Sequence, residues 1–290
     1  MSKIDFSSKK AVQRQLAGEG LRPKKGLGQN FLIDESVLLD IVAAAELDSK
    51  SCVLEIGPGM GVLTRELAKT AGRVVAVEID TSILPVLNKN LSEYNNVSVI
   101  NQDILKVNLD QLFTEYFGDQ PVKVIANLPY YITTPIVMKL LENTRISSIV
   151  IMIQREVARR LSASSGSKDF GAITLAVDYR AEVQPIRDVP PEAFMPAPKV
   201  WSSVIRLVRR DKPPIEVVDE KHFFDLIKGA FEKRRKTFIN SAGTYAPLNT
   251  SKEEVKEILE TFNISETIRG EALDMEAYAK ISNEMVCRRK

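Results

Sequence analysis

Four consecutive residues near the middle of the chain, Asn127-Leu128-Pro129-Tyr130, have the composition of a pocket for a flat ring that carries an amine. The side-chain carbonyl of Asn127 and the backbone carbonyl of Pro129 can accept the two amine hydrogens, and Tyr130 can stack on the ring. Because proline fixes its own φ, the Pro129 carbonyl is expected to point in one direction. A plain turn has no use for the paired tyrosines at positions 130 and 131, so we favour the pocket.

Such a pocket suits a reaction in which a weakly nucleophilic amine attacks an electrophile. The amine of adenine has a lone pair delocalised into the ring, and two carbonyl acceptors favour a pyramidal nitrogen whose lone pair can be aimed at an electrophile. This is catalysis by positioning and electrostatics rather than by a strong base. The chain's single histidine, His222, falls in an expected helical region far from the motif, so a mechanism that needs a central histidine is hard to build. We expect His222 to be a surface or packing residue.

A glycine-rich loop, "LEIGPGMGVLT" (54–64), lies between an expected strand and an expected helix. Glycines there let the backbone turn sharply and approach a ligand closely, at the N-terminus of the helix. The dinucleotide fingerprint would need glycine where the chain has Val62, and no phosphate-binding lysine follows as in a P-loop. The loop alone is compatible with a tight turn, but its G-x-G-x-G spacing points away from NAD and ATP.

Two acidic residues stand at the ends of the next two expected strands. Glu78 can accept both hydroxyls of a ribose, with a capping or ion-paired glutamate as the alternative, and Asp103 can accept from the amino group of a cofactor's adenine. With the glycine loop they predict one crevice at the carboxyl edge of a parallel sheet. Followed by Asn127 at the next strand end, this is the arrangement of methyltransferases that use S-adenosylmethionine to modify a planar amino group.

From residue 51 to about 155, short β-branched runs alternate with stretches of helical spacing, which predicts right-handed βαβ units and a parallel sheet covered on both faces. Two longer runs, 173–186 and 202–210, have only a Pro-rich loop between them, so we expect an antiparallel pair at the sheet edge. The other predicted strands are 52–56, 73–79, 97–100, 122–127 and 147–153.

Beyond a linker at 211–220 the hydrophobic period becomes helical, and Ser251 and Glu254 have the spacing of a capping box. The predicted fold class is therefore α/β: a Rossmann-like methyltransferase sheet of seven strands, mostly parallel, with a small C-terminal all-helical domain. We place the catalytic domain at 1–212, including a basic N-terminal segment at 1–28, and the helical domain at 219–290.

Composition is that of an ordinary soluble globular protein, with 44% hydrophobic and 27% charged residues among 290. No stretch reaches the length of a membrane span, and the N-terminus lacks the apolar centre of a secretory signal. Cys52 and Cys287 have no partner at metal-ligand spacing. We expect a cytoplasmic protein with neither a disulfide framework nor a metal site.

Positive charge is unevenly distributed. Residues 1–28 hold seven Lys or Arg and only two acids, and further basic clusters occupy 208–212, 232–236 and the C-terminal 287–290. Any single cluster can equally be a solvated surface with no binding role. Several together, in a chain otherwise rich in acids, favour a polyanionic partner.

The sequence resembles the ribosomal RNA adenine dimethyltransferase family over nearly its whole length, and most closely the bacterial enzymes of the small subunit (16S), whose loss gives kasugamycin resistance. The segments that carry the resemblance are "KKGLGQNFLID" (24–34), "EIGPGMGVLT" (55–64), "VEID" (77–80), "NQDIL" (101–105), "NLPYYI" (127–132), "FMPAPKVWSSVIRL" (194–207) and "FEKRRKTFINS" (231–241).

The resemblance implies roles for particular residues. Phe194 matches a family aromatic that sandwiches the target adenine against Tyr130, although a loop-anchoring core phenylalanine is the alternative. The segment before the first strand helps to enclose S-adenosylmethionine, with Gln29 assisting. The implied cofactor contacts are Gln29, Asn30, Leu32, Gly57, Gly59, Glu78, Ile79, Asp103, Ile104 and Asn127, and the implied catalytic residues are Asn127, Pro129, Tyr130 and Phe194.

The reaction implied by the resemblance is dimethylation of two adjacent adenosines in a loop near the 3′ end of 16S rRNA. The implied partner is this rRNA in the 30S subunit or its precursor, with a role in small-subunit biogenesis, and nothing in the sequence indicates an obligate dimer or a membrane partner. The helical domain and the N-terminal segment would then grip rRNA phosphates.

Three other functions remain open from the sequence. The large-subunit methyltransferases of macrolide resistance share the fold and a similar motif, although 194–207 and 231–241 favour the small-subunit enzymes. A mainly non-catalytic ribosome-assembly factor is a second alternative, against which the intact motif at 127–130 argues. A DNA adenine methyltransferase is a remote third, since the amine chemistry is identical.

Overall fold

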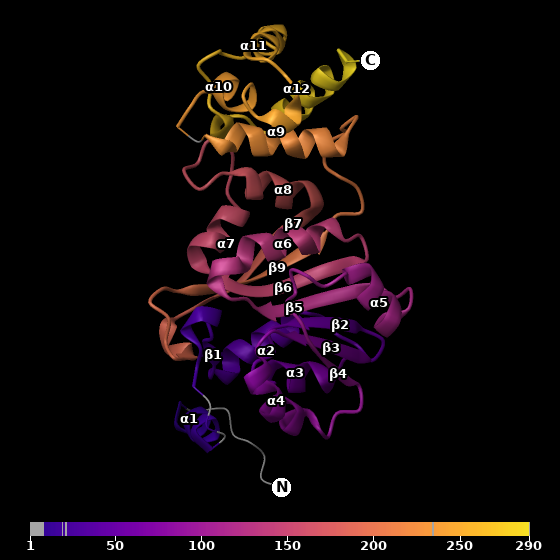
Figure 1. Ribbon diagram of the computed structural model, residues 1–290, viewed down its shortest axis with the longest axis vertical. Coiled ribbons are helices and arrows are strands. Elements are labelled where there is room, and N and C mark those ends of the chain that lie inside the picture. Colours follow the sequence, from indigo (N-terminus) through magenta and orange to yellow (C-terminus); the bar gives the residue numbers. More distant parts are fainter. Residues whose placement is uncertain (1–8, 19, 21, 234, 290) are drawn as a thin grey trace. The chain divides into compact units, whose positions relative to one another are not determined.

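The computed structural model describes residues 9–18, 20, 22–233 and 235–289 (Figure 1). The chain divides into two compact units: one formed by the chain up to residue 158 together with 182–209, the other by 159–181 and the chain from 210 onward. Of the basic segment expected at 1–28, residues 1–8, 19 and 21 lie outside the described residues. The described part contains α1 (Lys9–Gly18) and the short 3-10 turn Lys25–Leu27.

The first unit is built on a seven-stranded sheet with the order β4-β3-β2-β5-β6-β9-β7. The first five strands in this order are parallel neighbours, and β9 runs antiparallel to β6. The predicted fold class is thereby confirmed. The strands are β2 (Cys52–Ile56), β3 (Arg73–Glu78), β4 (Val97–Asn101), β5 (Val122–Asn127), β6 (Ile146–Gln154), β7 (Ala181–Val189) and β9 (Ser202–Arg209).

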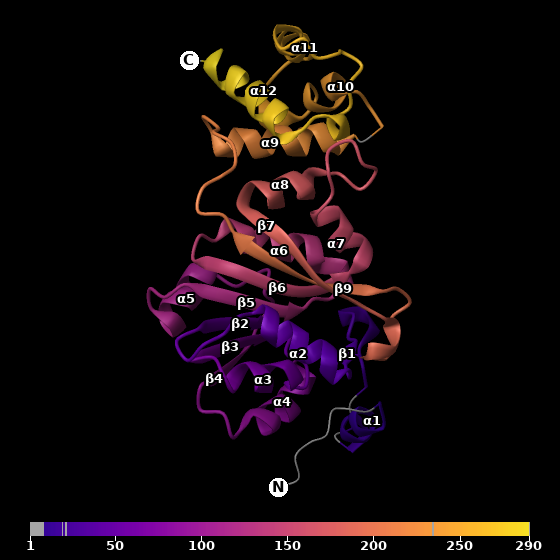
Figure 2. The ribbon, with the colours of Figure 1, turned by 180° about the vertical axis from the view of Figure 1, so that it is seen from behind.

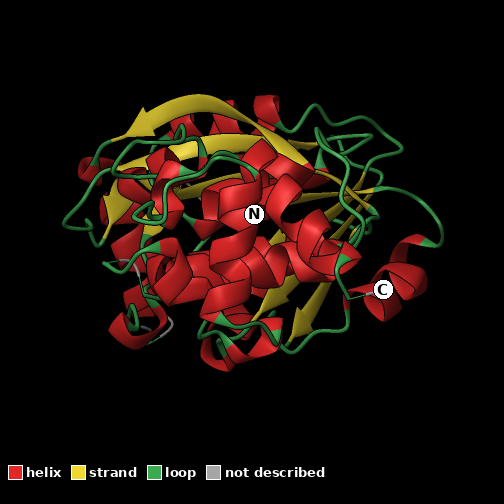
Figure 3. Ribbon diagram, turned by 90° about the horizontal axis from the view of Figure 1, so that it is seen from above, coloured by secondary structure: helices red, strands yellow, loops and turns green. Residues whose placement is uncertain are grey.

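Helices cover both faces of this sheet. From β2 the chain adds β3 and β4 on one side of the sheet, and it then adds β5 and β6 on the other side of β2. Because parallel crossovers are right-handed, the helices of these two halves lie on opposite faces of the sheet (Figures 1 and 2). Figure 3, with strands in yellow, shows the twist across the sheet. The helices are α2 (Glu35–Ala44), α3 (Val62–Ala68) and α4 (Leu84–Leu91) in the first half, then α5 (Leu109–Phe117) and α6 (Thr133–Glu142).

A second, two-stranded sheet was not predicted. β1 (Phe31–Leu32) pairs antiparallel with β8 (Phe194–Met195), with Leu32 opposite Phe194. The N–H of Ile33 continues the ladder by donating to the carbonyl of Ala193, 2.8 Å away. This pairing joins the segment before the first strand of the large sheet to the Pro-rich loop that precedes β9.

The second unit is helical, and aromatic rings fill its core. Tyr179 packs against Phe223 and Phe224, with ring centroids 5.3 Å apart in both pairs. Ser251 begins one helix as predicted, because its side chain accepts from the N–H of Glu254. The helices are α8 (Ala172–Arg180), α9 (Glu220–Glu232), α10 (Phe238–Ala242), α11 (Lys252–Thr261) and α12 (Met275–Cys287), and α7 (Arg155–Leu161) spans the boundary between the units.

The predicted strand at 173–186 is wrong in its first half, where the chain forms α8 before β7 begins at Ala181. Six of the nine residues of α8 are buried, including five in succession from Ile173 to Val177, so its sequence lacks the clear period of an amphipathic helix. Packing of Tyr179 on the rings of α9 selects the helix. Residues 159–181 consequently belong to the second unit, whereas the predicted catalytic domain ran unbroken to 212.

Within the described ranges, every helix falls short of the length and apolar character needed to cross a bilayer.

Candidate functional site

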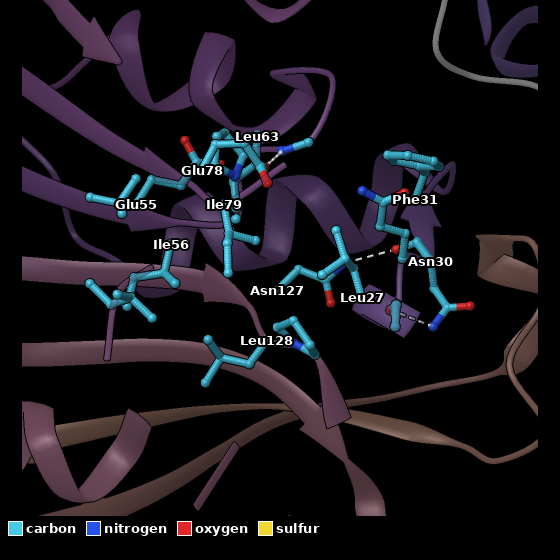
Figure 4. A pocket seen from close by; sticks show the side chains of 18 of the residues that line it. Leu27, Asn30, Phe31, Glu55, Ile56, Leu63, Glu78, Ile79, Asn127 and Leu128 are labelled. Atoms are coloured by element: carbon cyan, nitrogen blue, oxygen red, sulfur yellow. Dashed lines mark hydrogen bonds between the residues drawn. The ribbon is translucent and has the colours of Figure 1, made fainter. Parts of the chain in front are cut away.

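A cavity lies at the carboxyl ends of the parallel strands β2 to β5, where the predicted crevice was expected (Figure 4). Its wall combines the strand ends with the N-terminal segment that leads into β1. Of the residues predicted to bind the cofactor or the amine, all except Phe194 line it: Gln29, Asn30, Leu32, Gly57, Gly59, Glu78, Ile79, Asp103, Ile104, Asn127, Pro129 and Tyr130.

The glycine loop has a conformation that other residues would strain. Gly59 has φ 58° and Gly61 has φ 84°, both in the left-handed region. A Cβ at Gly61 would lie 2.9 Å from Leu87. The N–H of Gly59 donates to Glu78 Oε2 at 3.1 Å, so the loop is fixed to the neighbouring strand end.

Glu78 is buried and oriented by backbone groups. Its Oε1 accepts from the N–H of Asp80 at 2.8 Å, in addition to the Gly59 bond to Oε2. Burial raises the pKa of Glu78, and these backbone hydrogen bonds oppose the rise. A carboxylate oxygen can accept more than one hydrogen bond, so both oxygens retain capacity for ribose hydroxyls. Its bonds are to backbone N–H groups, which fits the predicted binding role better than an ion-paired glutamate.

Asn127 is held in one orientation across the cavity. Its Nδ2 donates to the backbone carbonyl of Asn30, 3.1 Å away, as the dashed line in Figure 4 shows. Since the amide nitrogen is committed to this carbonyl, the amide oxygen is the atom left to accept from a ligand. The side chain of Asn30 donates in turn to Gly28 O, at 3.1 Å, which stabilises the same segment.

The Pro129 carbonyl, predicted to accept an amine hydrogen, already accepts two hydrogen bonds within the chain. It accepts from the N–H of Ile132 at 3.3 Å and from Thr133 Oγ1 at 3.2 Å, which closes the 3-10 turn Tyr130–Ile132. Two hydrogen bonds occupy both of its lone pairs. Among the described residues nothing donates to the preceding carbonyl, that of Leu128, which also lines the cavity. The sequence could not distinguish these two neighbouring carbonyls.

Tyr130 lines the cavity with its hydroxyl fixed. The Tyr130 hydroxyl lies 2.6 Å from Oγ of Ser202, a fully buried residue at the start of β9. Burial raises the pKa of Tyr130, against the effect of this hydrogen bond, so the phenol stays neutral near pH 7. Ser202 escaped the sequence analysis because only the register of β9 against β6 brings it to the motif.

Phe194 lies in the core and does not line the cavity. Its side chain is 0% exposed and packs in the core with Val37, Val189 and Val204. Pairing of β8 with β1 turns the ring inward, opposite Leu32. In this conformation Phe194 anchors the Pro-rich loop, which was the alternative considered from the sequence. The sandwich of the target adenine between Phe194 and Tyr130 stays a prediction.

Asp80 joins the N-terminal segment to the cavity, and the sequence analysis assigned it no role. Its carboxylate accepts from Lys24 Nζ at 2.6 Å and from Gln29 Nε2 at 2.8 Å. Burial alone would raise the pKa of Asp80, but the hydrogen bonds from Lys24, Ser82 and Gln29 outweigh it and lower the pKa to about 2. Gln29 therefore acts on the segment that covers the cavity. We call these three side chains, Lys24, Gln29 and Asp80, the clasp.

Glu55 is a second acidic residue that the sequence analysis missed. It lies on β2, lines the cavity and is 1% exposed. Burial raises its pKa to about 8, with the Glu78 charge adding to the rise and Thr64 opposing it, and its Oε2 has no hydrogen-bond partner among the described residues. A cationic ligand beside this carboxyl would favour its ionised form and so lower its pKa.

These features fit S-adenosylmethionine. Glu78 and Asp103 line the cavity with carboxylates that can accept hydrogen bonds, Ile79 and Ile104 line it with apolar surface, and Glu55 adds a buried carboxyl. Throughout the described ranges, no three His, Cys, Asp or Glu side chains are grouped so that they could hold a metal ion.

The predicted basic clusters differ in how much charge they leave exposed. Arg209 donates to the carbonyls of Ile146 and Leu141, at 2.7 and 2.8 Å, and Arg289 donates to that of Leu248 at 2.6 Å. Their charge serves internal contacts at 208–212 and 287–290. In the cluster at 232–236, by contrast, Arg235 and Lys236 are exposed.

Comparison with known proteins agrees with the site. A sequence model of the family described as "Ribosomal RNA adenine dimethylase" matches residues 20–281. The chain is 50% identical to a ribosomal RNA small subunit methyltransferase A of Alkaliphilus metalliredigens, over 92% of this chain and 93% of that protein. It is 47% identical to the protein of that name from Bacillus cytotoxicus, over 92% of each chain.

Two solved structures have a similar fold. A dimethyladenosine transferase from Plasmodium falciparum has a TM-score of 0.74 and 26% identity, over 89% of this chain and 98% of that one. The 23S rRNA methyltransferase ErmE has a TM-score of 0.64 and 27% identity, over 89% and 100%. With the family match covering most of the sequence, the chain belongs to the ribosomal RNA adenine dimethylase family.

Proposed function

We propose that this protein uses S-adenosylmethionine to dimethylate the exocyclic amines of two adjacent adenosines in a loop near the 3′ end of 16S rRNA. The substrate is the 30S subunit or its precursor, and the protein acts as a cytoplasmic monomer in small-subunit biogenesis. The observation that carries the proposal is the Asn127 amide, whose nitrogen is committed to Asn30 and whose oxygen remains to accept from an amine in the same cavity as Glu78 and Asp103.

When bound, S-adenosylmethionine supplies a methyl group on a positively charged sulfur. The chain's residues position the acceptor amine. Asn127 Oδ1 accepts one amine hydrogen and the Leu128 carbonyl accepts the other, because the Pro129 carbonyl is already occupied. Tyr130, held by Ser202, stacks on the base. These contacts would direct the nitrogen lone pair toward the methyl group without a general base. The new N–C bond would replace the C–S bond, leaving S-adenosylhomocysteine, and the proton that the methylated amine then loses would pass to water.

Residues of the cavity wall would hold the cofactor. Glu78 would accept from its ribose hydroxyls and Asp103 from its adenine amine. The clasp keeps the segment carrying Asn30 and Leu32 against the strand ends, and so also maintains the Asn30 carbonyl on which Asn127 depends.

Sequence identity favours rRNA of the small subunit over rRNA of the large subunit as the substrate. Identity is 50% to the small-subunit enzyme of Alkaliphilus metalliredigens and 27% to ErmE, which acts on 23S rRNA. A mainly non-catalytic assembly role leaves the arrangement of Asn127, Tyr130 and Ser202 without a purpose.

The test is transfer of tritiated methyl groups from S-adenosylmethionine to 30S subunits from a strain that lacks the modification, in parallel with 50S subunits. Digestion and nucleoside analysis follow. The expected result is label in dimethyladenosine from 30S only. Label in 50S would support the macrolide-resistance type, and no label on either subunit with the cofactor bound would support an assembly factor.

A further inference from the structure

The chain's single tryptophan, Trp201, is exposed next to the cavity and has no role in the mechanism above. Its side chain is 42% exposed, whereas the following residue, Ser202, is fully buried. In an extended chain successive side chains point to opposite sides, so the inward Ser202 turns Trp201 outward. A large exposed ring at this position is unusual, since tryptophan is highly buried on average.

Trp201 lies close to the residue that would hold the target base. Neighbouring Cα atoms are about 3.8 Å apart, and Ser202 Oγ is 2.6 Å from the Tyr130 hydroxyl. The Trp201 carbonyl accepts from the N–H of Arg155 at 3.0 Å, which fixes the backbone. Because β9 runs antiparallel to β6 with Ser202 opposite Gln154, Trp201 stands at the same sheet edge as the cavity.

The guanidinium of Arg155 packs against the Trp201 ring. The Arg155 guanidinium lies 5.1 Å from the centroid of the Trp201 ring, and its NH1 is 3.8 Å from Asp188 Oδ2. Asp188 is held in turn by Ser203 Oγ, which donates to Oδ1 at 2.5 Å. Arg155 packs against the indole, and the indole remains the exposed flat surface at this place. An ordered ring loses less entropy when a base stacks on it.

We propose that Trp201 is a stacking platform for the nucleobase that neighbours the target adenosine in the RNA strand. A base that leaves its stack to enter the cavity deprives its neighbour of a stacking partner, and an indole at the rim replaces it. The inference rests on the proposed function, since it needs a single-stranded RNA whose target adenosine reaches Tyr130. Lys199, two residues earlier, is exposed and adds positive charge to the same loop.

The first test is steady-state methyl transfer to unmethylated 30S subunits. Trp201→Ala is expected to raise the KM for 30S about tenfold, the effect of losing one base–aromatic stack, with kcat within about threefold. Trp201→Phe keeps a ring and should stay within about threefold of the wild type. The matched control is Val200→Ala, which removes an equally exposed apolar side chain, 43% exposed, without removing a ring. Its KM should stay within about twofold.

The second test uses the fact that all tryptophan fluorescence comes from Trp201. Emission of the full-length protein is recorded during titration with single-stranded oligoadenylate RNA, to a concentration at which an independent binding measurement shows saturation. Stacking on the indole should quench the emission. An emission unchanged at saturation, or a KM unaffected by Trp201→Ala, overturns the platform while 30S methylation by the wild type still supports the proposed function.

Two further outcomes are also decisive. A lower kcat with an unchanged KM in Trp201→Ala would indicate a disturbed Tyr130 and would overturn stacking. Failure of the wild type to methylate 30S would overturn the proposed function and the platform with it.

Discussion

The carboxyl edge of the sheet and the core of the helical unit bury different kinds of residue. At the sheet edge Glu55, Glu78 and Asp80 are each at most 5% exposed. The helical core is formed around rings such as Phe238 and Tyr278, each 0% exposed. Burying acids lowers stability unless something compensates them, so their concentration at one edge indicates a site shaped for ligands. The aromatic core of the second unit indicates stability alone.

The two regions also respond to pH in opposite directions. Burial raises the pKa of Glu55 to about 8, so its stabilising contribution is complete below its ordinary pKa of 4.5 and is lost as the pH rises to about 8. Burial, with a smaller effect from Arg289, lowers the pKa of His222 from its ordinary 6.5. Its contribution is complete above 6.5 and is lost as the pH falls. The pH dependence of the free energy of unfolding therefore has one contribution from each unit, Glu55 on the alkaline side and His222 on the acidic side.

The largest effect is expected for Asn127→Ala, which removes the acceptor for the amine. Methyl transfer should fall at least about 100-fold, the usual loss when one well-placed polar group is removed from a transition state. Binding of rRNA should change less than about twofold, because its phosphate contacts lie elsewhere. Initial rates and a filter-binding assay measure the two quantities.

Asn95→Ala is the control, since Asn95 is exposed and does not line the cavity. Loss of RNA binding in Asn127→Ala would contradict the inference that catalysis and RNA binding depend on different residues.

The next effect concerns the clasp. Asp80→Asn removes the charge that Lys24 and Gln29 bind, which should free the segment carrying Asn30 and weaken S-adenosylmethionine binding about tenfold, the equivalent of one charge-assisted hydrogen bond. Isothermal titration calorimetry gives the affinity. Asp178→Asn, which breaks the Arg210 ion pair in the helical unit, should leave it unchanged. Equal losses in both variants would contradict a local role for the clasp.

The variant Glu55→Gln isolates the contribution of Glu55 to the pH dependence of stability. Between pH 7 and 9 the wild type should lose on the order of 1 kcal/mol of stability from this group as its proton leaves the folded state. The variant cannot titrate, so its free energy of unfolding should exceed that of the wild type increasingly toward pH 9. Urea unfolding of the ligand-free protein at several pH values measures this. His222→Gln should instead flatten the loss below pH 6.5 and leave the alkaline side unaltered.

The sequence predicts the sheet and the cavity well for a physical reason. Strands buried on both faces are continuous apolar runs, and parallel strands bring their carboxyl ends to one edge. Residues at those ends, such as Gly57, Glu78, Asp103 and Asn127, therefore come together whatever the details of the loops. All four line the cavity.

Features that depend on tertiary register could not be predicted in this way. Ser202 meets Tyr130 because β9 pairs with β6, and Phe194 turns inward because β8 pairs with β1. The helix α8 exists because Tyr179 packs on α9, which overrides an ambiguous apolar pattern. The choice between the carbonyls of Leu128 and Pro129 is decided by the 3-10 turn that follows.

The smallest effect is expected from charge in the helical unit. Arg235 and Lys236 are exposed, so replacing both with alanine should lower rRNA affinity only about threefold at moderate salt. The plot of log affinity against log salt should become shallower by about 0.7 to 0.9 for each phosphate that the variant no longer neutralises, because fewer counterions are released. Lys256→Ala with Lys280→Ala is the matched control, since both lysines pair with glutamates in the same unit. A slope that is equally steep in both double variants would remove the helical unit's cluster from RNA binding and leave that role to other basic residues of the chain.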